Sequence, residues 1–398
     1  MSVYKYILII PLLGFIIHVS AQDANSHATF DEHVDRIAEK LSKLGDTFAE
    51  KIESIDTKEI ERSAEKIARI SEQKAEQLAA QFDANIWEEE AAYQSNSDQA
   101  RTIQKVYIIS RNTPLQIDNR FGSVAVKTWQ KNEINVAITI RATQATGDRA
   151  AEIIRHVSII ESKSPSQISL TTQIDKEQSS WWNNLVNTKK HGVQINYLVY
   201  LPASNDLTIS NKYGSVSLPD LNGRIRLDVS YGSLKTGKLM GPQANINSSY
   251  GSATIGGAND ADLAIKYGSL ALGEVNKLRL DIGYCGNSRI DYINQSGDIA
   301  IRYSGGFHVG LNQGIHTFNM DAAYSSSDIR IHPEARFDYE VNVGYGGFDR
   351  GASTVTHEEP DPDSRGPKLH KSFQGYFGKA GSGNQVRIDA KYGSVNFE

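Results

Sequence analysis

The chain has 398 residues, a length that allows two or three domains. Hydrophobic residues make up 39% and charged residues 22%, which is ordinary for a folded soluble protein, and the 32 glycines against 10 prolines favour turn-rich β structure. The net charge is −5; residues 22–100 carry −10, with 19 acidic and 9 basic residues, and residues 101–398 carry +4, with 32 basic and 28 acidic residues. Neither part is basic enough for a nucleic-acid-binding surface, so we expect no nucleic-acid partner.

Residues 1–21 are typical of a secretory signal peptide. Lys5 gives the positive start, Ile7–Ile17 is the apolar stretch, and Val19-Ser20-Ala21 fits a cleavage site. The apolar stretch is shorter than the roughly 20 residues that span a bilayer, although an uncleaved anchor remains the alternative. The sequence therefore predicts an exported protein, periplasmic or at the cell surface, with no membrane span after signal removal. Cys285 is the only cysteine, so no disulfide framework is expected.

Residues 22–95 have a helical pattern. Apolar residues recur at steps of three and four over a stretch rich in Glu, Lys and Ala: Phe30, Val34, Ile37, Leu41, Leu44, Phe48, Ile52 and Ile55. This spacing predicts a long kinked helix or a helical hairpin. Two interpretations stay open, a coiled coil that makes a homo-oligomer and an amphipathic helix that docks on the chain's own β domain.

Residues 96–203 alternate in the manner of short strands, interrupted by a helix signal at 147–157. A polar loop near residues 176–191 contains Trp181 and Trp182. This Trp pair is either a weak binding site, as a carbohydrate-stacking platform, or an apolar plug over an open sheet edge.

Residues 204–398 contain a repeated sequence motif, first seen as Lys212-Tyr213-Gly214-Ser215-Val216. Its aromatic residue recurs at nearly constant spacing. Steps from Tyr213 to Tyr345 are 18, 19, 17, 17, 19, 21 and 21 residues, and an earlier copy surrounds Phe121. One long insertion, at 351–384, precedes the last copy. The repeat residues are Phe121, Tyr213, Gly214, Tyr231, Gly232, Tyr250, Gly251, Tyr267, Gly268, Tyr284, Tyr303, Tyr324, Tyr345, Tyr392 and Gly393.

A period near 20 residues with alternating apolar positions before each Tyr predicts a mainly β fold, a parallel β-solenoid (β-helix) with coils of about 17–21 residues. The alternative is an antiparallel meander. Ile225, Leu227 and Val229 precede Tyr231 at even spacing, so the Tyr is expected to face the core and to stack on the Tyr of the next coil. The Gly is expected to bend the strand because it tolerates positive φ.

Residues 207–397, and less closely 115–174, resemble the putative adhesin family of β-strand-repeat proteins from exported bacterial envelope proteins. The motifs that carry the resemblance are Ser210-Asn211-Lys212-Tyr213-Gly214-Ser215-Val216 and Leu227-Asp228-Val229-Ser230-Tyr231-Gly232-Ser233-Leu234. The resemblance implies a solenoid and an adhesion or envelope role, and it supplies no catalytic motif. It leaves the acidic helical segment unexplained.

The sequence predicts no catalytic residues, no cofactor and no metal site. Outward carboxylates such as Asp228 and Asp281 are scattered, and the acidic stretch 356–363 lacks a liganding pattern. The expected function is a non-catalytic, adhesin-like envelope protein that presents its repeats to an unknown protein or polysaccharide. The alternatives are a glycan-active β-helix enzyme and a periplasmic accessory to a signalling system.

Overall fold

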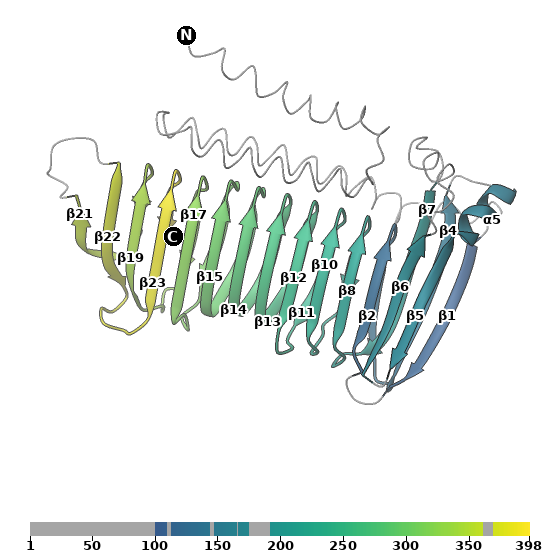
Figure 1. Ribbon diagram of the computed structural model, residues 1–398. Coiled ribbons are helices and arrows are strands. Elements are labelled where there is room, and N and C mark those ends of the chain that lie inside the picture. The colour runs from purple at the N-terminus through teal and green to yellow at the C-terminus, as the bar shows by residue number, and fades with distance from the viewer. Residues whose placement is uncertain (1–99, 110–112, 144–146, 165, 175–191, 361–368) are drawn as a thin grey trace, which may run out of the picture. The chain divides into compact units, whose positions relative to one another are not determined.

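The computed structural model describes residues 100–109, 113–143, 147–164, 166–174, 192–360 and 369–398 (Figure 1). All of them belong to the second of two compact units, residues 57–398. The predicted segments 1–21 and 22–95 and the Trp181–Trp182 pair lie outside the described residues. The described part is mainly β: its 24 strands form one large, mostly parallel sheet, and its helix α5 spans Gly147–Arg155.

Each repeat unit contributes one strand before its aromatic residue and one strand after it. The strands before are β2 (Leu115–Arg120), β8 (Leu207–Lys212), β10 (Ile225–Ser230), β12 (Ala244–Ser249), β17 (Thr317–Ala323), β19 (Phe337–Gly344) and β23 (Gln385–Lys391). The strands after are β3 (Val124–Trp129), β9 (Val216–Leu218), β11 (Leu234–Leu239), β16 (Phe307–Leu311), β18 (Ser327–Ile331), β20 (Phe348–Asp349) and β24 (Val395–Phe397). Three long strands run from one aromatic residue to the next: β13 (Ser252–Lys266), β14 (Ser269–Gly283) and β15 (Ser288–Arg302).

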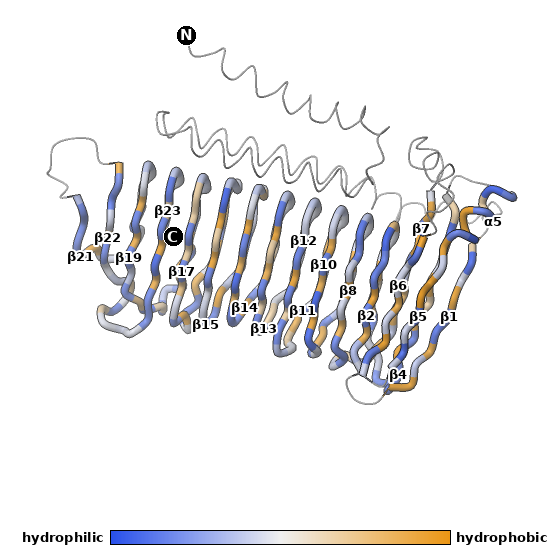
Figure 2. Tube along the Cα trace, in the orientation of Figure 1, coloured by the Kyte–Doolittle hydropathy of each residue, from blue (hydrophilic) through white to orange (hydrophobic). Residues whose placement is uncertain are grey.

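Strands of neighbouring units pair in parallel and in register, so equivalent residues lie side by side. Ile225 of β10, for example, pairs with Leu207 of β8 on one side and with Ala244 of β12 on the other. This parallel register excludes the antiparallel meander for the repeats from 207 to 331. Because the period of side-chain facing is two, the buried residues of β10 alternate with exposed ones. Figure 2 shows hydrophobic and hydrophilic residues alternating along the strands. The buried residues form one continuous apolar core, which burial of apolar surface stabilises.

The N-terminal end of the sheet changes from parallel to antiparallel pairing. β6 (Gln167–Ile174) pairs in parallel with β2, and β7 (Gly192–Pro202) pairs in parallel with β3. Beyond them, β5 (Val157–Ser164) is antiparallel to β6, β4 (Glu133–Thr143) is antiparallel to β7, and β1 (Ala100–Ile108) is antiparallel to β4. Helix α5 connects β4 to β5 and buries Ala150, Ile153 and Ile154.

The last repeat unit is out of sequence order. β23 lies between β17 and β19, and β24 lies between β18 and β20, all in parallel (Figure 1). We expected successive units to stack in the order of the chain, and that expectation is wrong here. The insertion at 351–384 contains β21 (Thr354–Glu359) and β22 (His370–Phe377), an antiparallel pair that extends the sheet beyond β19. This hairpin carries the chain past β19 and allows it to return.

The early copy around Phe121 packs directly on the first complete repeat. β2 pairs with β8 in the register in which the two sequences match, so Asn119 lies beside Asn211. Both asparagines are buried, and the Nδ2 of Asn119 donates to the Oδ1 of Asn211 at 3.0 Å. The Nδ2 of Asn211 also donates to the carbonyl oxygens of Gly122 and Gly214 at 3.1 and 2.7 Å. The pair therefore satisfies backbone acceptors at the turns of both units.

Replacing Asn211 by Ala should lower the free energy of unfolding by about 2 kcal/mol, because it leaves two buried carbonyl oxygens without that donor. Chemical denaturation measures the change. Asn247→Ala, at an outward position of β12, is the control and should change the free energy of unfolding little. Equal effects of the two substitutions would contradict this role for Asn211.

Candidate binding surface

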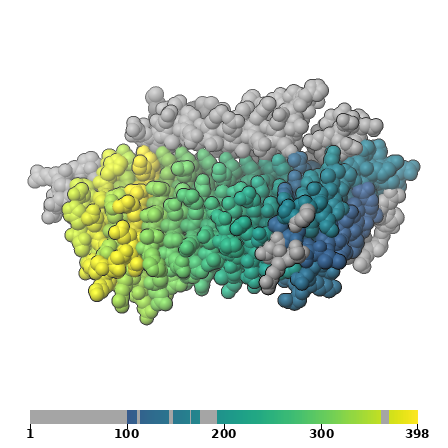
Figure 3. All heavy atoms as spheres, turned by 60° about the horizontal axis from the view of Figure 1, so that its bottom comes forward, coloured from purple at the N-terminus to yellow at the C-terminus, as the bar shows by residue number. Residues whose placement is uncertain are grey.

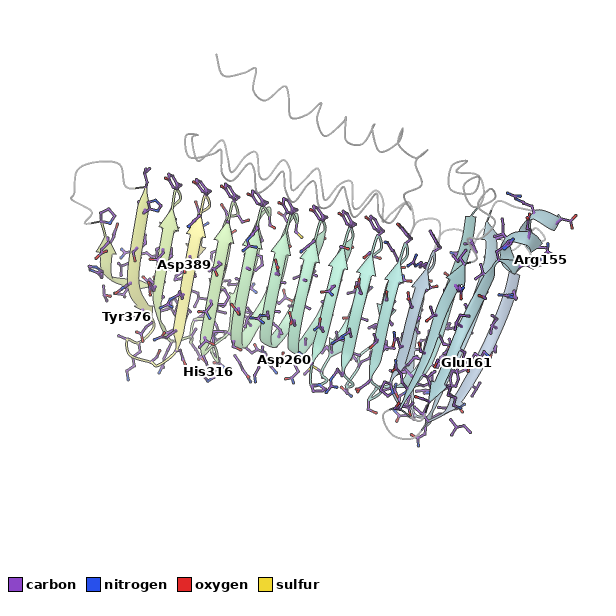
Figure 4. The ribbon with its side chains drawn as sticks, viewed as in Figure 1. Arg155, Glu161, Asp260, His316, Tyr376 and Asp389 are labelled. Carbon is purple, nitrogen blue, oxygen red and sulfur yellow. The ribbon has the colours of Figure 1, made fainter. Side chains whose placement is uncertain are left out.

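The repeated aromatic residues form one stacked column across the ends of the strands that precede them. Figure 4 shows a row of rings at these strand ends. Neighbouring ring centroids are 4.6–5.2 Å apart and the ring planes differ by at most 18°. In spatial order the column contains Phe121, Tyr213, Tyr231, Tyr250, Tyr267, Tyr284, Tyr303, Tyr324, Tyr392 and Tyr345. Because each ring inside the column is covered on both faces by its neighbours, the column joins the units and offers no inner ring face to a ligand.

The backbone at the aromatic residues differs from the expectation. All ten have positive φ, between 52° and 63°, and the strand before each one ends at the preceding residue, as β8 does at Lys212. The chain therefore turns at the Tyr itself and places its ring beside the strand ends, not among the core side chains. Tyr213, Tyr231 and Tyr324 are buried within the column but lie outside the packed apolar cluster. The expectation that each Tyr stacks on the Tyr of the next unit is confirmed, and three of the rings are buried. The expectation that the Gly carries the positive φ is wrong, because the Tyr carries it.

Where a glycine follows the aromatic residue, a side chain would collide with the neighbouring backbone. A Cβ on Gly214 would overlap the carbonyl oxygen of Gly122, and one on Gly232 would overlap that of Gly214. The same close backbone approach continues with Gly251 and Gly268. Farther along the column this position holds other small residues: Cys285, Ser304 and Ser325. There the Oγ of Ser325 accepts from the Ser304 N–H at 2.9 Å, and the Oγ of Ser304 accepts from the Cys285 N–H at 3.3 Å.

Burial shifts the titration of several tyrosines. Burial raises the pKa of Tyr267 and that of Tyr324 above the usual value near 10, and it raises the pKa of Tyr197 to about 12. The unfolded chain therefore loses these phenol protons first as the pH rises. Stability from these groups is complete below pH 10 and is lost above it.

We expect the free energy of unfolding to fall above pH 10, by about 1.4 kcal/mol per pH unit for each proton by which the two states differ. Urea denaturation at a series of pH values from 9 to 12 measures the slope. Tyr197→Phe removes one such group and should make the slope between pH 10 and 12 less steep. An unchanged slope in this variant would contradict the assignment to Tyr197.

The other residues singled out in the sequence do not converge on a catalytic centre. Cys285 is fully buried, and its thiol donates to the carbonyl oxygen of Ile265 at 3.4 Å. His357 contacts Glu359 at 3.0 Å on the exposed strand β21. Asp228 and Asp281 face outward from different strands, and burial raises the pKa of Asp228. Among the described residues, no group of three or more His, Cys, Asp or Glu side chains is placed to hold a metal ion.

The outward positions of the strands before each aromatic residue make a polar face. Equivalent polar residues of neighbouring units lie side by side and form pairs across the strands. The Arg387 guanidinium contacts the Glu340 carboxylate at 3.2 Å, and the Nδ2 of Asn342 donates to Asp389 at 2.9 Å. Asp389, labelled in Figure 4, lies on β23. In the space-filling view the successive units are side-by-side bands of colour (Figure 3).

A second outward region is apolar. We call it the outer patch, and it consists of Val106 and Ile108 on β1, Trp129 on β3, and Leu198 and Tyr200 on β7. The register joins these strands through β4: Val106 pairs with Asn135, and Asn135 pairs with Tyr200. Ile108 is 85% exposed and Val106 is 55% exposed. These are the two most exposed large hydrophobic side chains among the described residues, and in this the outer patch differs from the polar face.

Aromatic rings and lysines complete the outer patch. The Trp129 and Tyr200 rings contact each other, with centroids 5.4 Å apart, and the Trp129 indole N–H donates to the carbonyl oxygen of Glu133. The Lys131 ammonium lies 4.8 Å from the centre of the Trp129 ring, and the Lys127 ammonium lies 5.9 Å from that of Tyr200. Lys131 also lies 3.7 Å from Glu133. The outer patch thus consists of two apolar parts, one on β1 and one on β3 and β7, on either side of Glu133 and Asn135 of β4, with Lys127 and Lys131 beside the rings.

Sequence reasoning missed the outer patch. Its one signal was the alternation in residues 100–108, where Val106 and Ile108 occupy the same face as Gln104 and Thr102. The antiparallel register of β1, β4 and β7, which places Val106 in one row with Asn135 and Tyr200, was not predicted.

The comparisons with known proteins give structural neighbours only. No protein-family model and no curated protein matches the sequence. Among solved structures, the chain is similar to a putative cell adhesion protein from Clostridium sporogenes, at 10% identity over 75% of this chain and 99% of that one, with a TM-score of 0.20. It is also similar to a putative adhesin from Bacteroides fragilis, at 12% identity over 75% and 97%, with a TM-score of 0.28.

A putative lipid binding protein from Parabacteroides distasonis is another neighbour, at 11% identity over 75% of this chain and 96% of that one, with a TM-score of 0.30. The resemblance of the repeats to putative adhesins thus has counterparts among solved structures. Identities and TM-scores this low carry no argument about function. Across the part of the chain that the structure describes, we find no helix with the length and apolar character of a membrane span.

Proposed function

We propose that the chain is a non-catalytic, exported β-solenoid that acts as an adhesin-like binding protein of the cell envelope. The outer patch is the observation that carries the proposal. Exposed apolar patches bordered by polar residues mark interaction sites on soluble proteins, and Trp and Tyr contribute strongly to such sites. The in-register sheet and the aromatic column support this surface on a rigid frame. Export rests on the signal-like residues 1–21, and cell fractionation tests it.

The chemistry of the outer patch favours a protein partner over a polysaccharide. The side chains of Val106 and Ile108 offer a partner no hydrogen bond, whereas a sugar surface is rich in hydroxyl groups. A lysine ammonium also lies over each of the Trp129 and Tyr200 rings, where a sugar ring would have to stack. Apolar side chains together with Lys127 and Lys131 suit a protein partner that offers apolar and acidic side chains.

The test measures binding of fluorescently labelled protein to intact cells. Ile108→Lys should weaken binding at least about tenfold, because it places a charge beside Val106 in the apolar part of the outer patch on β1. The matched control is Ile160→Lys on β5, a 49% exposed residue outside the outer patch, which should bind like the unmodified protein. Both variants should unfold at the same denaturant concentration as the unmodified protein, since both side chains are solvent-exposed.

Treatment of the cells distinguishes the kinds of partner. Protease treatment should abolish binding, and enzymatic removal of surface polysaccharide should leave it intact. The reverse pattern would replace the protein partner with a polysaccharide. Unchanged binding by Ile108→Lys would show that the outer patch is not the binding site. New reducing ends or unsaturated sugars on incubation with envelope polysaccharide would favour a glycan-active enzyme.

A further inference from the structure

The C-terminal unit, residues 385–398, fills a position inside the sheet and not at its end. β23 pairs over its whole length with β17 and with β19, and the ring of Tyr392 lies between those of Tyr324 and Tyr345, at 4.7 and 4.8 Å. The chain forms both neighbouring units before it reaches residue 385. The C-terminal unit is therefore a segment inserted between two units that precede it in sequence.

Both sides of this position are specific for an extended segment of this sequence. The Tyr324 N–H donates to the carbonyl oxygen of Lys391, and the Tyr392 N–H donates to that of Gly344, at 2.9 and 2.8 Å. On the other row of strands, the Ser327 N–H donates to the carbonyl oxygen of Ser394 at 2.9 Å. The unit also buries apolar side chains, namely Val386, Ile388, Ala390, Val395 and Phe397. Without it, β17 and β19 would each have an open edge, and a gap as wide as one strand would separate the two edges.

A short, glycine-rich linker connects the C-terminal unit to β22. Residues 378–384 read Gly378-Lys379-Ala380-Gly381-Ser382-Gly383-Asn384, and the three glycines have φ of 74°, 67° and 84°. A Cβ on Gly381 or Gly383 would meet nothing within 4 Å. The linker is held at the start of β19 by hydrogen bonds. The Gly381 N–H donates to Asp338, the second residue of β19, and the Asn384 Nδ2 donates to the carbonyl oxygen of Arg336, the residue before β19. Glycine-rich segments of this kind are flexible when released.

We propose that this position also accepts the C-terminal unit of a second copy of the chain, so that two copies join by exchanging residues 385–398. The second copy supplies the same hydrogen bonds, the same buried side chains and the same Tyr392 ring. Exchange of an identical element therefore costs little beyond association of the two chains. The chain's own C-terminal unit is tethered near this position, and the tether gives it an effective concentration in the millimolar range. This favours insertion within one chain over exchange. Exchange is thus expected when chains refold together at a comparable concentration.

The test uses two full-length variants with different tags, one with Ala323→Cys and the other with Lys391→Cys. These residues are direct neighbours on β17 and β23, and adjacent strands lie about 4.8 Å apart, within the range that a disulfide spans. The two variants are unfolded, mixed, refolded at about 1 mM and oxidised. Exchange should give a disulfide-linked dimer that carries both tags. A single chain with both substitutions should form the disulfide internally, which establishes that the two positions react.

The matched control pair is Arg302→Cys in one copy and Ala323→Cys in the other. These residues are neighbours in the same way, on β15 and β17, but neither belongs to the C-terminal unit. Exchange of residues 385–398 leaves them in separate chains, so this pair should give several-fold less linked dimer. Equal amounts of dimer from the two pairs, or no dimer from the first pair when the internal disulfide forms, would overturn the proposal.

Discussion

Gly268→Ala should be among the most destabilising single substitutions in the repeats, lowering the free energy of unfolding by at least about 3 kcal/mol. The added Cβ would overlap the carbonyl oxygen of Gly251 in the neighbouring unit. The obstructing atom belongs to the backbone of the turn between β12 and β13, so relief requires the two units to move apart. That movement would also disturb the contacts of Tyr267 with Tyr250 and Tyr284. Urea denaturation followed by circular dichroism measures the change.

Gly283→Ala is the matched control for this prediction. Gly283 is the last residue of β14, directly before Tyr284, and a Cβ there would meet nothing within 4 Å. Because Ala restricts the unfolded chain more than Gly does, this substitution should be neutral or stabilise the protein by up to about 1 kcal/mol. If the two alanine variants were equally stable, close backbone approach would not be the reason for glycine at position 268.

Much of the fold follows from periodicity in the sequence. Alternating apolar residues before each Tyr predict strands with one buried face, and their constant distance from the Tyr predicts a parallel register. Both are present, for example in the pairing of Leu263 with Leu280. The match of Asn119 with Asn211 also identifies the early copy correctly. These features are predictable because each depends on local spacing that the repeats preserve.

Two features of the fold escape this reasoning for different physical reasons. A count of positions assigns the Tyr to the strand face, but the count cannot show that the Tyr itself adopts positive φ and ends the strand. Positive φ is unfavourable for a residue with a side chain, and here the stacked rings and paired backbones compensate for it. The position of the C-terminal unit depends on the path of residues 350–384, which have no repeat to indicate where the chain returns.

The candidate site was harder to predict than the fold because it depends on pairing between distant residues. Val106 and Tyr200 belong to one surface only because β4 lies between their strands. In the sequence each is an isolated apolar residue in an alternating segment. The Trp181–Trp182 pair, which attracted attention as consecutive aromatic residues in a polar loop, stays a prediction. Recurrent motifs thus indicate the frame, whereas the proposed binding surface lies where the frame departs from its repeat.

Tyr267→Ala tests the aromatic column and should lower the free energy of unfolding by about 3 kcal/mol. The substitution removes stacking on Tyr250 at 4.8 Å and on Tyr284 at 5.2 Å, and each such contact contributes about 0.5–1.5 kcal/mol beyond the burial of its area. The expected loss is large because the removed ring lies within the column, where the rings on either side lose a stacking partner. Thermal and urea denaturation measure it.

Tyr267→Gly separates the contribution of the ring from that of the backbone. Residue 267 has φ of 55°, a conformation in which a Cβ costs about 1–2 kcal/mol and glycine pays no such penalty. Glycine should therefore be at least as stable as alanine at this position, although in an ordinary strand it is the worse choice. Tyr267→Phe, which keeps the ring and its stacking, should retain most of the stability. If alanine were clearly more stable than glycine, the chain would not turn at the tyrosine; if the phenylalanine variant lost as much stability as the alanine variant, stacking would not be what the column contributes.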